Sequence, residues 1–185
     1  MDVVKNIEKK LHQFTQKYYT SELIKGTILF LSLGCVYLFF TLFLEYFLWL
    51  KPLSRTILFW VFVLVELFLL IRFIAFPIFK LIGLRKGISY EQASTIIGNH
   101  FPEVKDKLLN VLQLQQSSNT SDLLLASIAQ KSAQLQPIPF AKAVDFKQNK
   151  KYLKYAIIPV FIFIISLLSG FYKDLTQSLK RVVNH

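Results

Sequence analysis

Two long apolar runs joined by a short polar turn constrain this chain more than any other feature. The runs cover residues 24–50 and 56–82, and residues 51–55 separate them. A hydrocarbon core about 30 Å thick is crossed by about 20 helical residues, so each run is long enough to span a membrane. A third apolar run, residues 155–172, is shorter but also sufficient. The sequence therefore predicts an all-α integral membrane protein with a transmembrane hairpin, a small helical segment and a third transmembrane helix.

Composition supports a membrane environment. Hydrophobic residues make up 54% of the 185 residues, and 18 residues are Phe, more than a soluble core of this size would hold. The net charge of +11 comes from Lys and Arg concentrated beside the apolar runs. Anionic lipid headgroups account for that placement, so we expect an anionic bilayer rather than nucleic acid as the partner. We also expect contacts with other membrane or envelope proteins, and a homo-oligomer remains an alternative.

The segment before the first run, residues 1–23, has the spacing of an amphipathic helix. Its apolar residues recur every three or four positions: Val4, Ile7, Leu11, Phe14 and Tyr18. Two arrangements would bury this stripe. The helix either lies in the headgroup plane with its stripe inward, or packs on the soluble segment of the same chain.

Basic residues predict how the chain is threaded. The N-terminal segment and residues 83–154 are rich in Lys and Arg, whereas the hairpin turn holds only Lys51 and Arg55. Two spans place both basic segments on one side, so the positive-inside rule puts them in the cytoplasm. We therefore expect a multi-pass membrane protein with a cytoplasmic N-terminus and a C-terminus on the outer side.

Three ionisable residues inside the apolar runs are the candidate intramembrane functional residues: Glu45, Glu66 and Arg72. Glu45 lies near the outer end of the first span, where Arg55 or Lys51 can reach it. Glu66 lies near mid-bilayer. We expect a neutral Glu66 bonded to a small polar residue of another helix, such as Ser32, Thr41 or Ser166, with a partner subunit or proton path as the alternative. Arg72 is expected to extend toward the cytoplasmic face.

The cytoplasmic segment, residues 83–154, predicts two or three short amphipathic helices. Ser89 and Gln92 form a capping-box pattern, Pro102 opens a second helix, and a third runs from Asp122 to about Leu135. These helices have few apolar residues, so we expect them to lean on the membrane or on a partner. The candidate partner-binding residues are Val104, Leu108, Val111, Leu112, Leu124 and Ile128.

A polybasic stretch precedes the third run, residues 155–172. Its residues are candidate anionic-lipid contacts: Lys142, Lys147, Lys150, Lys151 and Lys154. The tail after the third run, residues 173–185, is expected on the outer side and shows no sign of a domain. Phosphate-binding glycine loops, metal-ligand spacing and nucleophile motifs are absent from the sequence. We therefore predict no catalytic, cofactor or metal site, and a protein that is not an enzyme.

Three stretches resemble a family of large Bacteroidetes inner-membrane proteins of unknown function. They are residues 87–115 (GISYEQASTIIGNHFPEVKDKLLNVLQLQ), residues 123–144 (LLLASIAQKSAQLQPIPFAKAV) and residues 45–50 (EYFLWL). In that family, a similar three-span region precedes a very long outer-side region. The resemblance implies a bacterial inner membrane with a periplasmic C-terminus, and a chain that is either truncated at His185 or the ordered part of a longer protein. It supplies no catalytic residue.

Two hypotheses follow. The first is a non-enzymatic membrane anchor and assembly module of a bacterial cell-envelope complex. The alternative is a proton- or ion-coupled transport or energy-transducing subunit that uses Glu66, with Glu45.

Overall fold

The computed structural model describes residues 2–84, 87–116 and 122–184. Within these ranges the regular structure is entirely helical, and three helices are long and apolar enough to cross a membrane. This confirms the predicted all-α chain with three candidate spans. The chain divides into two compact units: unit 1 comprises residues 1–21 and 79–146, and unit 2 comprises residues 22–78 and 147–185. Helix α1 (Asp2–Leu48) contributes residues to both units.

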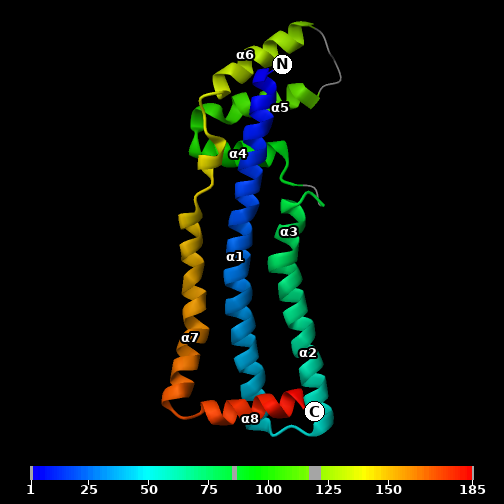
Figure 1. The fold of residues 1–185 in the computed structure, drawn as a ribbon, viewed down its shortest axis with the longest axis vertical. Helices are drawn as coiled ribbons and strands as arrows, with labels where there is room; N and C mark the ends of the chain where they lie inside the picture. Colours follow the sequence, from blue (N-terminus) through cyan, green and yellow to red (C-terminus); the bar gives the residue numbers. More distant parts are fainter. Residues whose placement is uncertain (1, 85–86, 117–121, 185) are drawn as a thin grey trace. The chain divides into compact units, whose positions relative to one another are not determined.

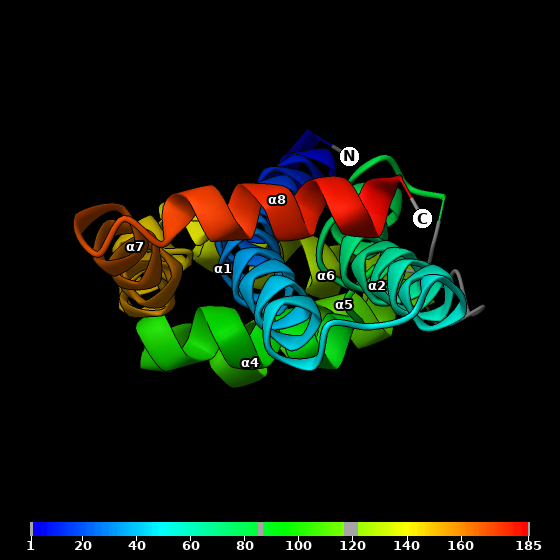
Figure 2. The same ribbon diagram turned by 90° about the horizontal axis from the view of Figure 1, so that it is seen from below.

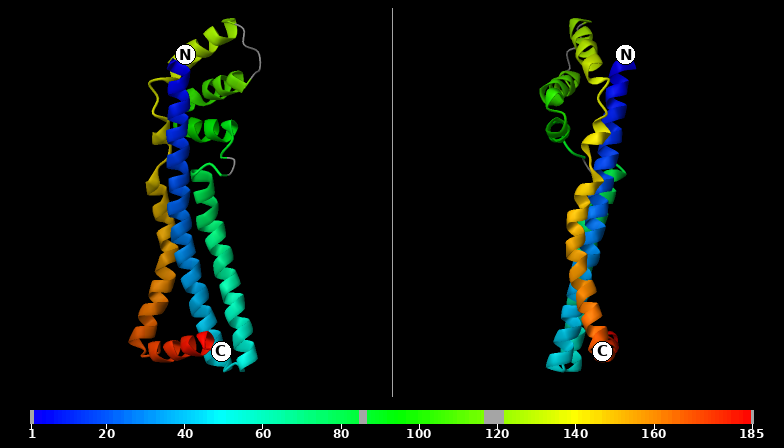
Figure 3. Two further views of the ribbon diagram at one scale, coloured as in Figure 1. Left: turned by 45° about the vertical axis from the view of Figure 1, so that its right-hand side comes forward. Right: turned by 90° about the vertical axis from the view of Figure 1, so that its left-hand side faces the viewer.

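Unit 2 contains the candidate spans. It combines the later part of α1 with two helices that run lengthwise beside it and one that lies across their ends, as Figures 1, 2 and 3 show. Its elements after α1 are α2 (Pro52–Leu70), a π-helical turn η1 (Ile71–Ala75), the start of α3 (Phe76–Leu81), most of the 3₁₀ helix η4 (Phe146–Tyr152), α7 (Leu153–Leu168) and α8 (Tyr172–Val183).

The hairpin turn is tighter than the five residues expected. Pro52 occupies the first turn of α2, where its missing N–H costs no helical hydrogen bond, so Ser54 and Arg55 are already helical. The chain reverses at Trp49, which has a positive φ of 44°, an uncommon conformation for a bulky residue.

The second span is not a regular α-helix throughout. Pro77 has no N–H to donate to the carbonyl of Phe73. Just before Pro77 the helix widens into the π turn, in which the Phe76 N–H donates to the carbonyl of Ile71, five residues earlier. The widened turn brings the Phe73 carbonyl against α1: a Cβ at Gly26 would lie 1.9 Å from the Phe73 oxygen. Only glycine permits this approach, in which the Gly26 Cα–H faces a carbonyl oxygen.

The chain after the third run is helical. Ser169 and Gly170, with a φ of 75° at Gly170, end α7, and α8 then occupies Tyr172–Val183. Leu175, Ser178 and Val182 recur at helical spacing and are buried. The tail expected to lack any sign of a domain is therefore an amphipathic helix packed on unit 2.

Unit 1 is built from short helices around the first turns of α1. Its elements are α4 (Tyr90–His100), the 3₁₀ helix η2 (Pro102–Val104), α5 (Lys105–Gln116), α6 (Asp122–Leu135) and the 3₁₀ helix η3 (Phe140–Ala143). The predicted capping box at the start of α4 is confirmed, because the Gln92 N–H donates to the Ser89 side chain and the Ser89 N–H donates to the Gln92 side chain.

A continuous apolar core holds unit 1 together. Its fully buried residues are Ile7, Phe14, Ala93, Ile97, Val104, Leu108, Val111, Leu112, Leu135, Phe140 and Val144. Ile7 and Phe14 come from α1, with Leu11 and Tyr18 packed against the same core. Of the two arrangements left open for the N-terminal stripe, the structure therefore shows packing on the chain's own soluble segment.

This core corrects the expectation for the partner-binding residues. Val104, Leu108, Val111, Leu112 and Ile128 are 0–5% exposed, so the chain itself covers these five side chains and does not leave them open to a partner. Leu124 lies in α6, but its side chain is outside the described residues. The expectation failed because the stripe of α1 supplies the apolar surface that the short helices lack.

Two lysines of α1 satisfy carbonyl groups in the proline-rich segment after α6. Lys10 Nζ donates to the carbonyl oxygens of Gln136 and Ile138, and Lys17 Nζ donates to that of Ala141 at 2.8 Å. Pro137 and Pro139 prevent this segment from continuing α6, so its carbonyls need partners outside a helix. These two lysines therefore pack within unit 1.

Candidate functional site

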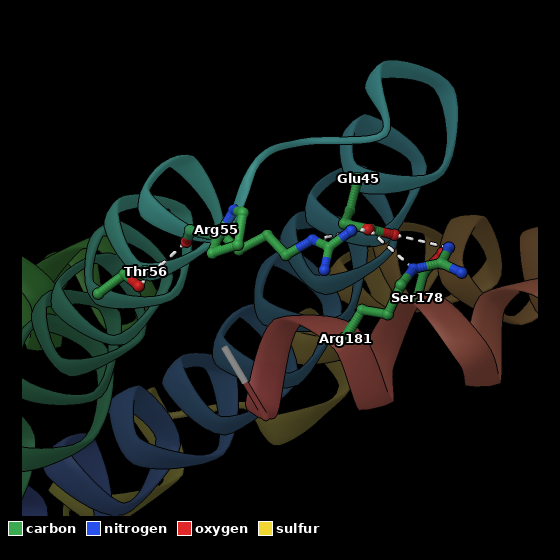
Figure 4. A network of polar contacts seen from close by, with 6 residues as sticks. Glu45, Arg55, Thr56, Ser178 and Arg181 are labelled. Carbon is green, nitrogen blue, oxygen red and sulfur yellow. Dashed lines mark hydrogen bonds and ion pairs between the residues drawn. The ribbon is translucent and has the colours of Figure 1, made fainter.

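Glu45, near the C-terminal end of α1, is a charged residue of unit 2 that pairs with two arginines. Its side chain is 0% exposed, and Arg181 of α8 holds both carboxylate oxygens. Arg181 Nε donates to Oε1 at 2.9 Å, and Nη2 donates to Oε2 at 2.9 Å (Figure 4). This two-point geometry is the strongest arrangement available to a carboxylate and a guanidinium group. The hydrogen bond to Glu45 raises the pKa of Arg181.

A second arginine approaches Glu45 from α2. Arg55 Nε lies 3.2 Å from Oε1, an ion pair without the alignment of a hydrogen bond. The structure thus contains the Glu45–Arg55 pair that the sequence indicated, and it adds Arg181, which sequence reasoning did not identify. Glu45 joins three helices, α1, α2 and α8, at one end of unit 2 (Figure 4).

Aromatic contacts reinforce the same end of the unit. The Arg181 guanidinium lies 5.0 Å from the Trp49 ring centroid, a cation–π distance. Phe171, between α7 and α8, packs edge-on against Tyr46 at 4.6 Å and stacks on Phe43 at 5.7 Å. We call Glu45, Trp49, Arg55, Phe171, Ser178 and Arg181 the turn-side clamp. The two arginines of the clamp satisfy the enclosed Glu45 carboxylate, so this group is not open for chemistry.

Glu66 differs from Glu45 because its Oε1 is buried without a hydrogen-bond partner among the residues that the structure describes. Its carboxylate rests against α1 at Gly34, where a Cβ would lie 2.8 Å from Oε2. An open pocket of about 260 Å³ adjoins it, lined by Phe30, Leu31, Gly34, Cys35, Leu38, Phe62 and Glu66. Glu66 therefore occupies a nearly apolar site, and its carboxylate fits against α1 because Gly34 has no side chain.

The hydroxyl groups expected to bond Glu66 have other partners. Ser32 donates to the Ile28 carbonyl at 2.6 Å, Thr41 to that of Tyr37 at 2.9 Å, and Ser166 to that of Phe163 at 2.7 Å. This corrects the expectation, and its reason is local, because a Ser or Thr inside a helix satisfies its hydroxyl on the preceding turn.

The other predicted residues are dispersed. Arg72 is exposed in the π turn and does not pair with Glu66. Lys142, Lys147, Lys150, Lys151 and Lys154 are all exposed, and Lys151 and Lys154 lie over the rings of Tyr152 and Tyr155 at 5.2 and 5.1 Å. Exposure leaves these ammonium groups accessible to a charged surface but does not gather them into a pocket.

The described residues include no cluster of three His, Cys, Asp or Glu side chains suited to a metal ion. The only cysteine, Cys35, is exposed beside the Glu66 pocket. In comparisons with known proteins, no family model, no curated protein and no solved structure matches this chain.

Proposed function

We propose that this chain is a non-enzymatic membrane anchor and assembly module of a bacterial cell-envelope complex. The observation that carries the proposal is the dual use of α1. One helix supplies the central core residues Ile7 and Phe14 of unit 1 and then continues as the first candidate span of unit 2. A folded helical unit is thereby attached to a membrane helix without an intervening linker. The resemblance to large Bacteroidetes inner-membrane proteins favours the cell envelope as its location.

The charged residues support an anchoring role. The turn-side clamp uses Glu45 and two arginines to fix helix ends, and Lys10 and Lys17 satisfy backbone carbonyls. The clamp holds α8 next to the hairpin turn. This agrees with three membrane spans that leave the C-terminal end of the chain on the same side of the membrane as the turn. We assign that side to the periplasm and the basic segments to the cytoplasm of an inner membrane.

The surface of α2 explains why such a module needs surroundings. None of the residues of α2 is buried, and its exposed apolar side chains follow one helical face: Ile57, Trp60, Val61, Leu64, Leu67 and Phe68. In water this face would be costly, whereas lipid chains or neighbouring membrane helices cover it at no such cost.

The test is purification of the tagged chain from its native membrane in mild detergent, with mass and co-purifying proteins measured together. We expect a complex that contains other envelope proteins in fixed ratio. A Phe14→Ala variant, which weakens unit 1, should stay in the membrane and lose partners that bind unit 1. A monodisperse chain without partners in both proteins would contradict the assembly role.

A second candidate function rests on Glu66. A carboxylate with an unpartnered oxygen beside an open pocket is the group expected of a proton- or ion-coupled subunit, with Glu45 as the secondary carboxylate. The satisfied contacts of Glu45 argue for Glu66 acting without it.

Two substitutions separate these functions. Glu66→Gln retains a hydrogen-bonding side chain but cannot carry a proton, whereas Glu66→Leu removes both properties. If Glu66 binds a partner helix through a hydrogen bond, assembly survives in the Gln variant and weakens in the Leu variant. If Glu66 carries protons, the Gln variant assembles and expresses normally but loses function in the cell.

A further inference from the structure

A cavity in unit 1 is separate from both carboxylates described above. It encloses about 620 Å³, within the usual size range of ligand sites. One wall is a face of α1, with His12, Thr15, Gln16 and Tyr19 at spacings of three and four residues. The other wall is the end of the second span and the turn after it, from Lys80 through Leu84, together with Gly87.

The polar part of the cavity suits an anion. Lys80 supplies an ammonium group, held 5.8 Å from the Tyr19 ring centroid. Thr15 contributes a hydroxyl, Gln16 an amide and His12 an imidazole. No carboxylate lines the cavity among the residues described there. Hydrogen-bond donors around one cation are the arrangement that binds a phosphate group.

The other part of the cavity is apolar and exposed. Ile82 is 60% exposed and Leu84 is 71% exposed, on either side of Gly83. Gly83 has a φ of 78°, and its N–H donates to the Lys80 carbonyl at 3.3 Å, so the backbone reverses here in a conformation that favours glycine. Two large aliphatic side chains at the exit of an anion site would be costly in water.

Both walls adjoin candidate spans. Lys80 and Leu81 are the last residues of the second span, and the α1 face around His12 and Tyr19 directly precedes the first apolar run, residues 24–50. At the end of a membrane span, the abundant molecules are lipids, which have a polar headgroup and apolar chains. The position thus favours lipid over a soluble anion.

We propose that this cavity binds the phosphate headgroup of an anionic phospholipid. Lys80 contacts the phosphate, Thr15 and Gln16 donate hydrogen bonds to it, and the acyl chains run past Ile82 and Leu84. This site is separate from the exposed lysines of the polybasic stretch, which attract an anionic surface without enclosing a headgroup. The proposal rests on the proposed function, because it requires that the chain spans a membrane.

The test is native mass spectrometry of the purified chain in non-ionic detergent, titrated with dioleoylphosphatidylglycerol or dioleoylphosphatidylcholine. We expect one phosphatidylglycerol to be retained per chain, in preference to phosphatidylcholine. Removing one lysine–phosphate contact should weaken that binding about fivefold in Lys80→Gln, while Lys80→Arg retains it. Lys107→Gln removes the same charge from an exposed position of α5, away from the cavity lining and the polybasic stretch, and should leave the bound lipid unchanged.

A second variant guards against misfolding of Lys80→Gln. Thr15→Val removes one hydroxyl from α1 with little change in shape, and it should weaken phosphatidylglycerol binding about fivefold. Equal binding of the two lipids, or equal losses in Lys80→Gln and Lys107→Gln, would overturn the proposal. Displacement of the lipid by millimolar inorganic phosphate would also overturn it and assign the site to a soluble anion.

Alkaline carbonate extraction of the membranes distinguishes failure of this site from failure of the anchor. A chain that remains in the membrane but shows no lipid preference would refute the site alone. A chain released by carbonate would refute both the site and the proposed anchor.

Discussion

At the scale of single residues, Glu45 and Glu66 show that two glutamates of the same unit can have opposite surroundings. Glu45 is fully enclosed, and two guanidinium groups surround it. Glu66 has an unpartnered oxygen and adjoins a pocket instead of a cation. The desolvation free energy of a buried carboxylate is offset where paired hydrogen bonds replace water, and it is not offset elsewhere. The contacts of Glu45 therefore hold helix ends together, whereas Glu66 is the carboxylate that we propose as a site for a ligand or partner.

The first prediction concerns Arg181. Arg181→Gln removes both charged hydrogen bonds to Glu45, while Arg55 still offers partial compensation. We expect α8 to lose about 1.5 to 3 kcal/mol of local stability, the range for hydrogen bonds to charged groups. Amide hydrogen exchange in α8 should then be more than about tenfold faster. Lys180→Gln removes the same charge from the exposed neighbour and should leave α8 protected; equal exchange in both variants would contradict the clamp.

The second prediction concerns Gly26. An added methyl group would meet the Phe73 carbonyl at 1.9 Å, so Gly26→Ala must push α1 away from the π turn. Overpacking of this kind costs about 1 to 3 kcal/mol. Thermal unfolding in detergent should show a lower midpoint for Gly26→Ala. Thr27→Ala alters the exposed neighbouring position and serves as the control, and an unchanged midpoint in Gly26→Ala would disprove the close approach.

At the scale of elements, α1 unites two kinds of helix surface. Its N-terminal turns bury one stripe in the core of unit 1, and its later turns carry the small or polar positions Gly26, Ser32, Gly34 and Thr41, which are buried within unit 2. The core of unit 1 is formed across segments distant in the sequence, which compensates for the few apolar residues of each short helix. The stability of unit 1 therefore depends on the N-terminal turns of α1.

A core substitution tests this dependence. Phe14 is 0% exposed, and Phe14→Ala should cost about 3 to 5 kcal/mol of the stability of unit 1. Limited proteolysis should then cut within α4, α5 or α6, while carbonate extraction still leaves the chain in the membrane. Gln13→Ala changes the adjacent exposed position and should behave as the parent protein. Protease resistance of Phe14→Ala would show that the short helices fold without α1.

The sequence predicts some elements better than others for physical reasons. Apolar length identifies each span and Ser89 with Gln92 identifies a helix start, because both signals lie within one segment. Arg181, the second partner of Glu45, was missed because it is separated from Glu45 by 136 residues. The spacing of Leu175, Ser178 and Val182 could have revealed α8, although not its partner. The N-terminal stripe was ambiguous because lipid and a helical core bury the same apolar residues.

At the scale of the whole molecule, the proposed membrane topology makes a direct prediction. In a Cys35→Ala background, Ser54→Cys in the exposed first turn of α2, next to the hairpin turn, should react with an impermeant maleimide added to intact spheroplasts. Gln130→Cys in α6 should react only after the membrane is permeabilised. The positive-inside rule sets this orientation, with the basic N-terminal and middle segments in the cytoplasm. Labelling of Gln130→Cys in intact spheroplasts, with Ser54→Cys protected, would invert it.

The π turn before Pro77 contains one of the two contacts that set the register between the helices of the hairpin. Two glycines of α1 meet the second span, Gly34 at Glu66 and Gly26 at Phe73, so eight residues of one helix match seven of the other. Deleting Ile71 or Arg72 would shorten the spacing between the Glu66 and Phe73 contacts by one residue and rotate one contact relative to the other. Gly34 and Gly26 could not then both face their present neighbours. The second span therefore tolerates changes of residue type along its exposed face more readily than a change of length.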